Sequence, residues 1–134
     1  MKLLSAQLSP FAARCRMAVY AGDLPVEIAP ANMWAADGQK SPEYLALNPI
    51  GKVPALILDD GSCLPESETI VDYLADKFPA AGLHPETPEL QAKARLLARI
   101  TELYVATPGI GMFMQLFAPE KDRAVVDHAC AEMA

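Results

Sequence analysis

The spacing of hydrophobic residues near the start of the chain changes from strand-like to helical and back. Leu3 with Leu4, and the alternation Val26-Glu27-Ile28, predict two short strands. Between them, residues 10–22 place the apolar side chains on one helical face: Phe11, Cys15, Ala18 and Val19. The order strand, helix, strand predicts a βαβ unit.

A second group of elements follows, and turn residues mark its boundaries. Ser41-Pro42-Glu43 predicts a short helix, because serine caps helices and proline fits the first helical position; Asn48-Pro49 ends it. Residues 53–58 are β-rich, Asp60-Gly61 predicts a hairpin turn, and Cys63-Leu64 begins the return strand. A further amphipathic helix starts at Ser67 and ends at Pro79. The predicted order is therefore βαβα-ββα.

The rest of the chain is predicted to contain helices only. The loop at residues 81–86 divides a domain at 1–80 from a partial all-helical domain at 87–134. Thr87-Pro88-Glu89 repeats the cap and proline signature, and helical spacing continues to Ala106. We expect Pro108, Gly109 and Gly111 to break or kink this helix. A last segment is expected to open at Pro119-Glu120 and run to Ala134.

Composition and charge narrow the class of protein. The 134 residues are 52% hydrophobic and 21% charged, enough for a folded core in one domain or in one domain and part of another. Because the net charge is −6, the summed field does not attract a phosphate backbone, and we expect no nucleic-acid partner. Without a long apolar run or a signal-peptide core, we expect no membrane association and a cytoplasmic location. Three widely spaced cysteines predict neither a disulfide scaffold nor a structural zinc, so no metal is expected.

Ser9 stands where the first strand passes into the first helix, which is a position that favours an anion. Its hydroxyl either caps the helix or donates a hydrogen bond to a thiolate or oxyanion. Arg14 and Arg16 are expected to form a solvated edge. Neither His84 nor His128 stands in a pattern with a nucleophile, so the sequence does not support a hydrolytic triad.

Two further segments are candidates for ligand binding. Pro54 stands at the start of a strand; a cis Val53–Pro54 bond would turn the Val53 backbone toward an extended peptide ligand, whereas a trans bond would be an ordinary turn. Glu66 and Ser67 open a helix with a carboxylate and a hydroxyl. They either start and cap that helix or hold an amino-acid head group, with Ser67 on its carboxylate and Glu66 on its ammonium.

The segment from Ile110 to Phe117 is apolar nearly all round, which is unusual for a lone surface helix. Its methionines and aromatic residues are expected to be core, an electrophile pocket or an exposed contact patch. The sequence leaves open whether the chain is a fragment of a longer protein or whether a subunit contact covers this segment.

These motifs together resemble the glutathione S-transferase family, with a Ser-type active site similar to the zeta, omega or phi classes. The resemblance rests on the order and spacing of the segments Ser9-Pro10-Phe11-x-x-Arg14-x-Arg16, Ser41 to Pro54 with Asn48-Pro49-x-Gly51-Lys52-Val53-Pro54, and Glu66-Ser67-x-Thr69-Ile70. It implies a thioredoxin-like α/β domain (βαβ-ββα) followed by the first helices of an all-α domain. The 48 residues from Thr87 onward are fewer than the family's helical domain has.

The resemblance also implies a glutathione site and no metal. Ser9 matches the position whose hydroxyl stabilises the glutathione thiolate, and Val53 the backbone that pairs with the cysteinyl unit before a cis Pro54. Glu66 with Ser67 matches the γ-glutamyl site, and Lys40 is a weaker candidate for the glycyl carboxylate.

Because thiol-transferring members carry cysteine where this chain has Ser9, the resemblance implies conjugation of glutathione to a small hydrophobic electrophile, by a homodimer with a role in detoxification. Cys15 does not replace that cysteine, because its place on the helix predicts a buried small apolar residue. The alternatives are a glutathione-dependent cis–trans isomerase and a non-catalytic transferase-like binding module.

Overall fold

Contacts within the chain fall into two groups, Met1–His84 and Pro85–Ala134. The division lies inside the segment 81–86 that the sequence marks as a linker. The structure is a computed structural model, and it describes residues 1–31 and 38–134.

The first unit contains a four-stranded mixed sheet in the order β2-β1-β3-β4. β1 (Lys2–Ser5) runs parallel to β2 (Glu27–Pro30) and antiparallel to β3 (Ala55–Ile57), and β3 is antiparallel to β4 (Cys63–Pro65). The parallel pair confirms the predicted βαβ unit, and the antiparallel pair confirms the hairpin at Asp60-Gly61. β2 is shifted toward its C-terminal end by comparison with the predicted run 26–28, whereas β3 is shorter at both ends than the predicted run 53–58.

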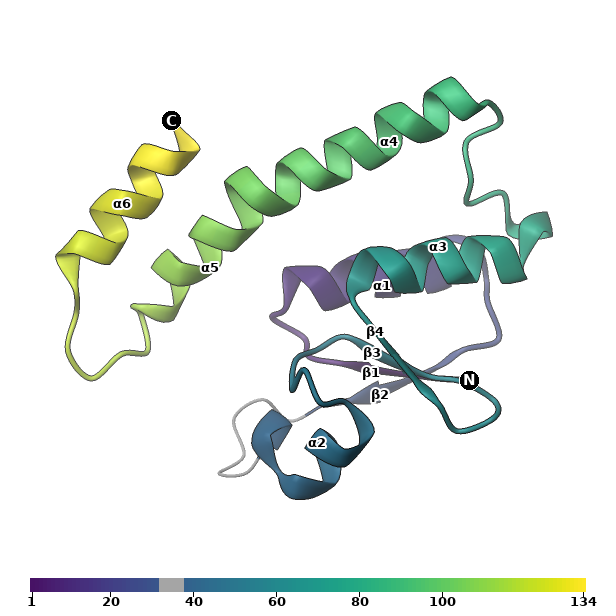
Figure 1. Cartoon of the computed structure of the whole chain (residues 1–134), viewed down its shortest axis with the longest axis horizontal. Helices are drawn as coiled ribbons and strands as arrows, with labels where there is room; N and C mark the ends of the chain where they lie inside the picture. The colour runs from purple at the N-terminus through teal and green to yellow at the C-terminus, as the bar shows by residue number, and fades with distance from the viewer. Residues whose placement is uncertain (32–37) are drawn as a thin grey trace. The chain divides into compact units, whose positions relative to one another are not determined.

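Three helices accompany this sheet. α1 (Pro10–Ala21) and α3 (Ser67–Lys77) lie side by side on one face of it, and α2 (Pro42–Leu47) lies on the other side (Figure 1). Ser9 and Ser41 cap α1 and α2 by accepting from the backbone N–H groups three residues later, and a proline follows each serine. A short 3-10 turn, Pro79–Ala81, follows α3 and ends at Gly82. The arrangement is the expected thioredoxin-like fold.

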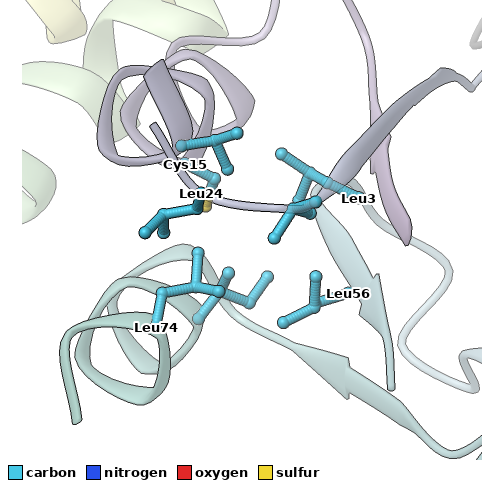
Figure 2. Close-up of a cluster of buried hydrophobic side chains, with 8 residues drawn as sticks. Leu3, Cys15, Leu24, Leu56 and Leu74 are labelled. Atoms are coloured by element: carbon cyan, nitrogen blue, oxygen red, sulfur yellow. The ribbon is translucent and has the colours of Figure 1, made fainter. Parts of the chain in front are cut away.

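The core lies between the sheet and the helix pair α1 and α3. Figure 2 shows Leu3 and Leu56 from the strands, Cys15 from α1 and Leu74 from α3 pointing toward one another, with Leu24 beside them. All except Leu24 are fully buried. Burying such side chains is the main source of stability for a unit of this size. The full cluster consists of Leu3, Cys15, Val19, Leu24, Val26, Leu56, Ile70 and Leu74.

The second unit is helical, and its first helix is not broken where the sequence predicts. α4 (Pro88–Thr101) passes through one wide π turn, Glu102–Ala106, directly into α5 (Thr107–Met114). The helix does not end at Pro108, Gly109 or Gly111, so the predicted break was wrong. Its α-helical hydrogen bonding is instead interrupted by the π turn directly before Pro108, a residue that lacks the N–H for such a bond. The Thr107 N–H and hydroxyl both bond the Glu102 carbonyl oxygen, which closes the wide turn.

The last helix also begins later than the sequence suggests. α6 (Arg123–Met133) starts after Asp122, whose side chain accepts from the Ala124 N–H, so the expected opening at Pro119-Glu120 was wrong. Those two residues form part of the loop between α5 and α6, in which the Lys121 ammonium donates to the carbonyls of Gln115 and Leu116 at 2.6 and 2.7 Å. α6 packs against α5.

The apolar segment at Ile110–Phe117 divides into a half-buried part and an exposed part. Ile110 and Met112 are half-buried, whereas Leu116 and Phe117 expose 67% and 52% of their surface. Leu97 and Tyr104 on the helix before it are exposed as well. In residues 1–31 and 38–134, no helix is both long and apolar enough to span a bilayer.

Candidate glutathione site

The topology of the sheet brings all the candidate segments of the first unit to one end. The pairs Ser5–Pro30, Leu4–Ala55 and Ala55–Pro65 place the carboxyl ends of β1, β2 and β4 beside the amino end of β3. Ser9 follows β1, Lys40 lies beyond β2, Val53-Pro54 precedes β3, and Glu66-Ser67 follows β4. Segments far apart in sequence therefore meet at the same edge of the fold.

Ser9 is buried, with 8% of its surface exposed, and it caps α1. Its Oγ accepts from the Ala12 N–H at 3.2 Å, and its own N–H donates to the Ala6 carbonyl at 3.2 Å. A hydroxyl has one proton and two lone pairs, and capping uses only a lone pair. The two interpretations of Ser9 are therefore compatible, because the capping oxygen keeps a proton that it can donate to a ligand.

The first turns of α3 contact α1 through Ser67. The Arg14 guanidinium donates to Ser67 Oγ at 3.4 Å, and the Cys15 thiol donates to the Ser67 carbonyl at 3.5 Å. Burial raises the pKa of the Cys15 thiol to about 12, although Arg14 and Arg16 act in the opposite direction. Cys15 is therefore a protonated core residue at neutral pH, as its place on the helix predicted, and not a nucleophile.

Glu66 and Ser67 do not cap α3 in the way that the sequence suggested. Glu66 is itself the residue at the N-cap, its side chain makes no capping hydrogen bond, and Ser67 Oγ instead accepts from Arg14. Glu66 has a φ of 68°, a value that side-chain-bearing residues rarely adopt and that tends to occur at functional sites. Its carboxylate is exposed while the Ser67 side chain is buried. The interpretation of Ser67 as a helix cap is therefore wrong.

The Val53–Pro54 peptide bond is cis, as the resemblance implied. Lys52, which precedes Val53, is held by two hydrogen bonds to its carbonyl oxygen. This oxygen accepts from the Tyr44 hydroxyl at 2.7 Å and from Asn48 Nδ2 at 2.9 Å. Desolvation raises the pKa of Tyr44, so the phenol stays protonated and can donate. Asn48 is 1% exposed, and its Oδ1 also accepts from the Ile50 N–H. The loop before β3 is therefore tied to α2.

Lys40 lies against the same loop. It ends a short 3-10 turn, Gly38–Lys40, and its ammonium stands 2.9 Å from the point where a Cβ on Gly51 would be. Gly51 itself has a φ of 63°, which favours glycine. The side chain of Lys40 is exposed, so its charge is available to a ligand at this edge.

The two arginines of α1, Tyr44 and Asn48 have structural roles that the sequence pattern did not predict. Arg14 and Arg16 are not a solvated edge. Arg14 donates to Ser67, and Arg16 donates to Ser5 at the end of β1 and to Ala6 and Gln7 in the loop before α1. A signal was present for Tyr44 and Asn48, since both fall in the motif from Ser41 to Pro54, but their shared acceptor on Lys52 depends on the fold of the loop.

Taken together, the edge offers a ligand one buried hydroxyl, one exposed lysine, one exposed carboxylate and the backbone of Val53. These groups suit a small peptide that carries both charges and a thiol. Within the part of the chain that the structure describes, no group of three or more His, Cys, Asp and Glu side chains is placed to hold a metal ion.

Comparison with known proteins is consistent with this geometry. Residues 3–85 match the family described as glutathione S-transferase, N-terminal domain. Among solved structures, a glutathione S-transferase from Methylobacillus flagellatus with glutathione bound superposes with a TM-score of 0.85 at 27% identity, covering 98% of this chain and 64% of that one. A glutathione transferase homologue from Sulfitobacter, also with bound glutathione, gives 0.79 at 26% identity over 98% of this chain and 62% of that chain.

Curated relatives point the same way. A maleylacetoacetate isomerase from Pseudomonas aeruginosa is 36% identical over 101 residues, which are 75% of this chain and 48% of the relative. Glutathione S-transferase U6 from Arabidopsis thaliana is 30% identical over 132 residues, 98% of this chain and 56% of the relative. The chain thus spans about half the length of these relatives. With its first domain matched and its sheet, cis proline and serine arranged as described, the chain belongs to the glutathione S-transferase family.

Proposed function

We propose that the first unit binds glutathione at the sheet edge described above and activates its thiol. Ser9 donates its hydroxyl proton to the sulfur, and the Val53 backbone pairs with the cysteinyl unit beside the cis Pro54. Ser67 and the first amides of α3 take the γ-glutamyl carboxylate, while Glu66 takes the ammonium and Lys40 the glycyl carboxylate. These assignments rest on the position of each group at one end of the sheet.

The proposed reaction is transfer of the glutathione thiolate to a small hydrophobic electrophile. A hydrogen bond from Ser9 stabilises the charged sulfur and lowers the pKa of the thiol, whose proton goes to solvent. The sulfur then attacks an electrophilic carbon; the C–S bond forms, and the leaving group departs with its bonding electrons. Holding the two reactants together supplies the remaining rate enhancement.

A second candidate is favoured by the 36% identity to an isomerase. In this reaction the thiolate adds to a cis double bond that is conjugated with a carbonyl group, and the electron pair moves onto the carbonyl oxygen. Rotation about the resulting single bond follows, and expulsion of the thiolate restores the double bond in the trans form. Glutathione is regenerated, so the same site serves as a catalyst without net transfer.

The observation that carries the proposal is the buried Ser9 hydroxyl, which caps α1 through its oxygen and retains its proton. The test combines calorimetry of glutathione binding with turnover of a chlorodinitroarene and, separately, of a cis enedione acid. Binding with turnover of the arene supports transfer, and turnover of the enedione alone supports isomerisation. Binding without either turnover would make the chain a non-catalytic module, and absence of binding would overturn the proposal.

The proposal extends to the setting in which the protein acts. We propose a homodimer in the cytoplasm with a detoxifying role, and a hydrophobic electrophile as second substrate. The exposed Leu116 and Phe117 support a further apolar partner for the helical unit, whether electrophile or protein. Light scattering of the purified chain measures the oligomeric state directly, and a monomer at all concentrations would remove the dimer from the proposal.

A further inference from the structure

Arg16 is the side chain that ties α1 back to the loop from which it emerges. Its guanidinium donates through Nη1 to Ser5 Oγ at 2.6 Å and to the Ala6 carbonyl at 3.0 Å, and through Nη2 to the Gln7 carbonyl at 3.1 Å. Arg16 is half-buried, and Ser5 is buried with 6% of its surface exposed. One planar group thus holds three consecutive residues, Ser5 at the end of β1 and Ala6 and Gln7 in the loop that follows.

The Ala6 carbonyl connects this clamp to Ser9. It accepts from Arg16 on one side and from the Ser9 N–H, at 3.2 Å, on the other. The Ser9 side chain makes a second hydrogen bond, because its hydroxyl oxygen accepts from the Ala12 N–H. The position of the hydroxyl is therefore set by two anchors, the start of the helix and the loop that Arg16 holds.

We propose that Arg16 is a positioning residue for the Ser9 hydroxyl: by fixing the turn Ser5–Gln7, it keeps Ser9 where it can donate to the glutathione sulfur. This inference rests on the proposed function of Ser9. Arg16 does not itself touch the ligand in this scheme, and it acts through the Ala6 carbonyl.

The geometry distinguishes this role from a simple effect of charge. A guanidinium can bond three acceptors in one plane, whereas a lysine ammonium at the end of a flexible stem carries the same charge without that fork. A charge effect on the sulfur would therefore survive Arg16→Lys, and a positioning effect would be lost.

The experiment measures the thiol pKa of bound glutathione from the ultraviolet absorbance of its thiolate. The variants are Ser9→Ala, Arg16→Lys, Arg16→Gln and the double variant Ser9→Ala/Arg16→Lys, with Lys93→Gln on exposed α4 as the control that removes one positive charge. We expect Ser9→Ala to raise the thiol pKa by about one unit and Arg16→Lys to raise it by a similar amount. The double variant should show no further increase, because both changes remove the same hydrogen bond.

Each alternative result has a defined meaning. A parental thiol pKa in Arg16→Lys, or an additive increase in the double variant, overturns the inference while leaving the role of Ser9 intact. A parental pKa in Ser9→Ala, or no glutathione binding by the parent, overturns the proposed function and the inference together. If the Arg16 variants do not fold, Ser5→Ala removes one of the three acceptors; we then expect a smaller increase in pKa, and no increase would overturn the inference.

Discussion

Gly51 and Gly82 share one backbone conformation, and comparing them tests the role proposed for Lys40. Both have a φ of 63°, so alanine at either site suffers the same left-handed backbone penalty, about 1–2 kcal/mol. They differ in their surroundings. A Cβ at Gly51 would lie 2.9 Å from the Lys40 ammonium, 2.9 Å from Leu45 Cδ2 and 3.2 Å from the Gln39 carbonyl oxygen. A Cβ at Gly82 would meet no heavy atom of the described chain within 4 Å, its chain neighbours aside.

The two substitutions have separate expected effects on the free energy of unfolding and on the affinity for glutathione. The Lys40 ammonium and the Leu45 methyl end flexible side chains and can move aside, but the Gln39 carbonyl belongs to the backbone. Gly51→Ala should therefore lower the free energy of unfolding more than Gly82→Ala does. Displacing the ammonium removes a charge-assisted hydrogen bond worth about 1.5–3 kcal/mol, so only Gly51→Ala should weaken glutathione binding, by about tenfold or more.

The assay is calorimetric titration of both variants with glutathione and with γ-glutamylcysteine, which lacks the glycyl carboxylate. The parent and Gly82→Ala should prefer glutathione, and Gly51→Ala should bind the two ligands equally. An unchanged preference in Gly51→Ala, or an equal loss of preference in Gly82→Ala, would refute the assignment of Lys40 to the glycyl carboxylate. Denaturant unfolding of both variants checks that each is folded under the conditions of the titration.

Three more predictions follow from the site and the core. Ser9→Ala should slow turnover and also lower the free energy of unfolding by about 1 kcal/mol, because the α1 cap is lost; turnover assays and denaturant titration measure the two effects. Ser67→Ala should weaken glutathione binding in calorimetry but lower stability by no more than about 1 kcal/mol, because its hydroxyl does not cap α3. Since the Cys15 pKa is raised from 9.0 to about 12 in the folded state, stability should be full below pH 9 and fall as pH rises toward 12, at most by about 1.4 kcal/mol per pH unit. Unfolding titrations should show a smaller decline in Cys15→Ala, and an identical decline would contradict the assignment.

Local signals account for the elements that the sequence predicted well. The helix starts at Ser9-Pro10, Ser41-Pro42 and Thr87-Pro88 were all found, because a hydroxyl that caps a helix and a proline in its first turn act within a few residues. The hairpin at Asp60-Gly61 was found for the same reason, since Gly61 has the positive φ that such a turn requires.

The predictions that the structure contradicts depend on contacts between residues that are not neighbours in the sequence. Pro108 was expected to break or kink the helix, but the chain stays helical and passes through a wide turn directly before it. Ser67 looked like a cap, yet its hydroxyl accepts from Arg14 on another helix. Within the candidate site, the cis bond before Pro54 was an expectation from family resemblance alone, because sequence spacing does not distinguish cis from trans.

The wide turn at Glu102–Ala106 also rotates the side chains of the following helix, α5, about the helix axis. One extra residue within a turn advances the helix by about 100°, since an α-helix has 3.6 residues per turn. The side chains of α5 therefore point in directions that differ by about this angle from those an unbroken extension of α4 would give. In this phase the small residue Gly109 lies near Met133 of α6, whose sulfur would be 3.9 Å from a Cβ there. The continuous helix from α4 to α5 therefore presents side chains in two directions. One set lies along α4, and the other lies along α5, where it packs against α6.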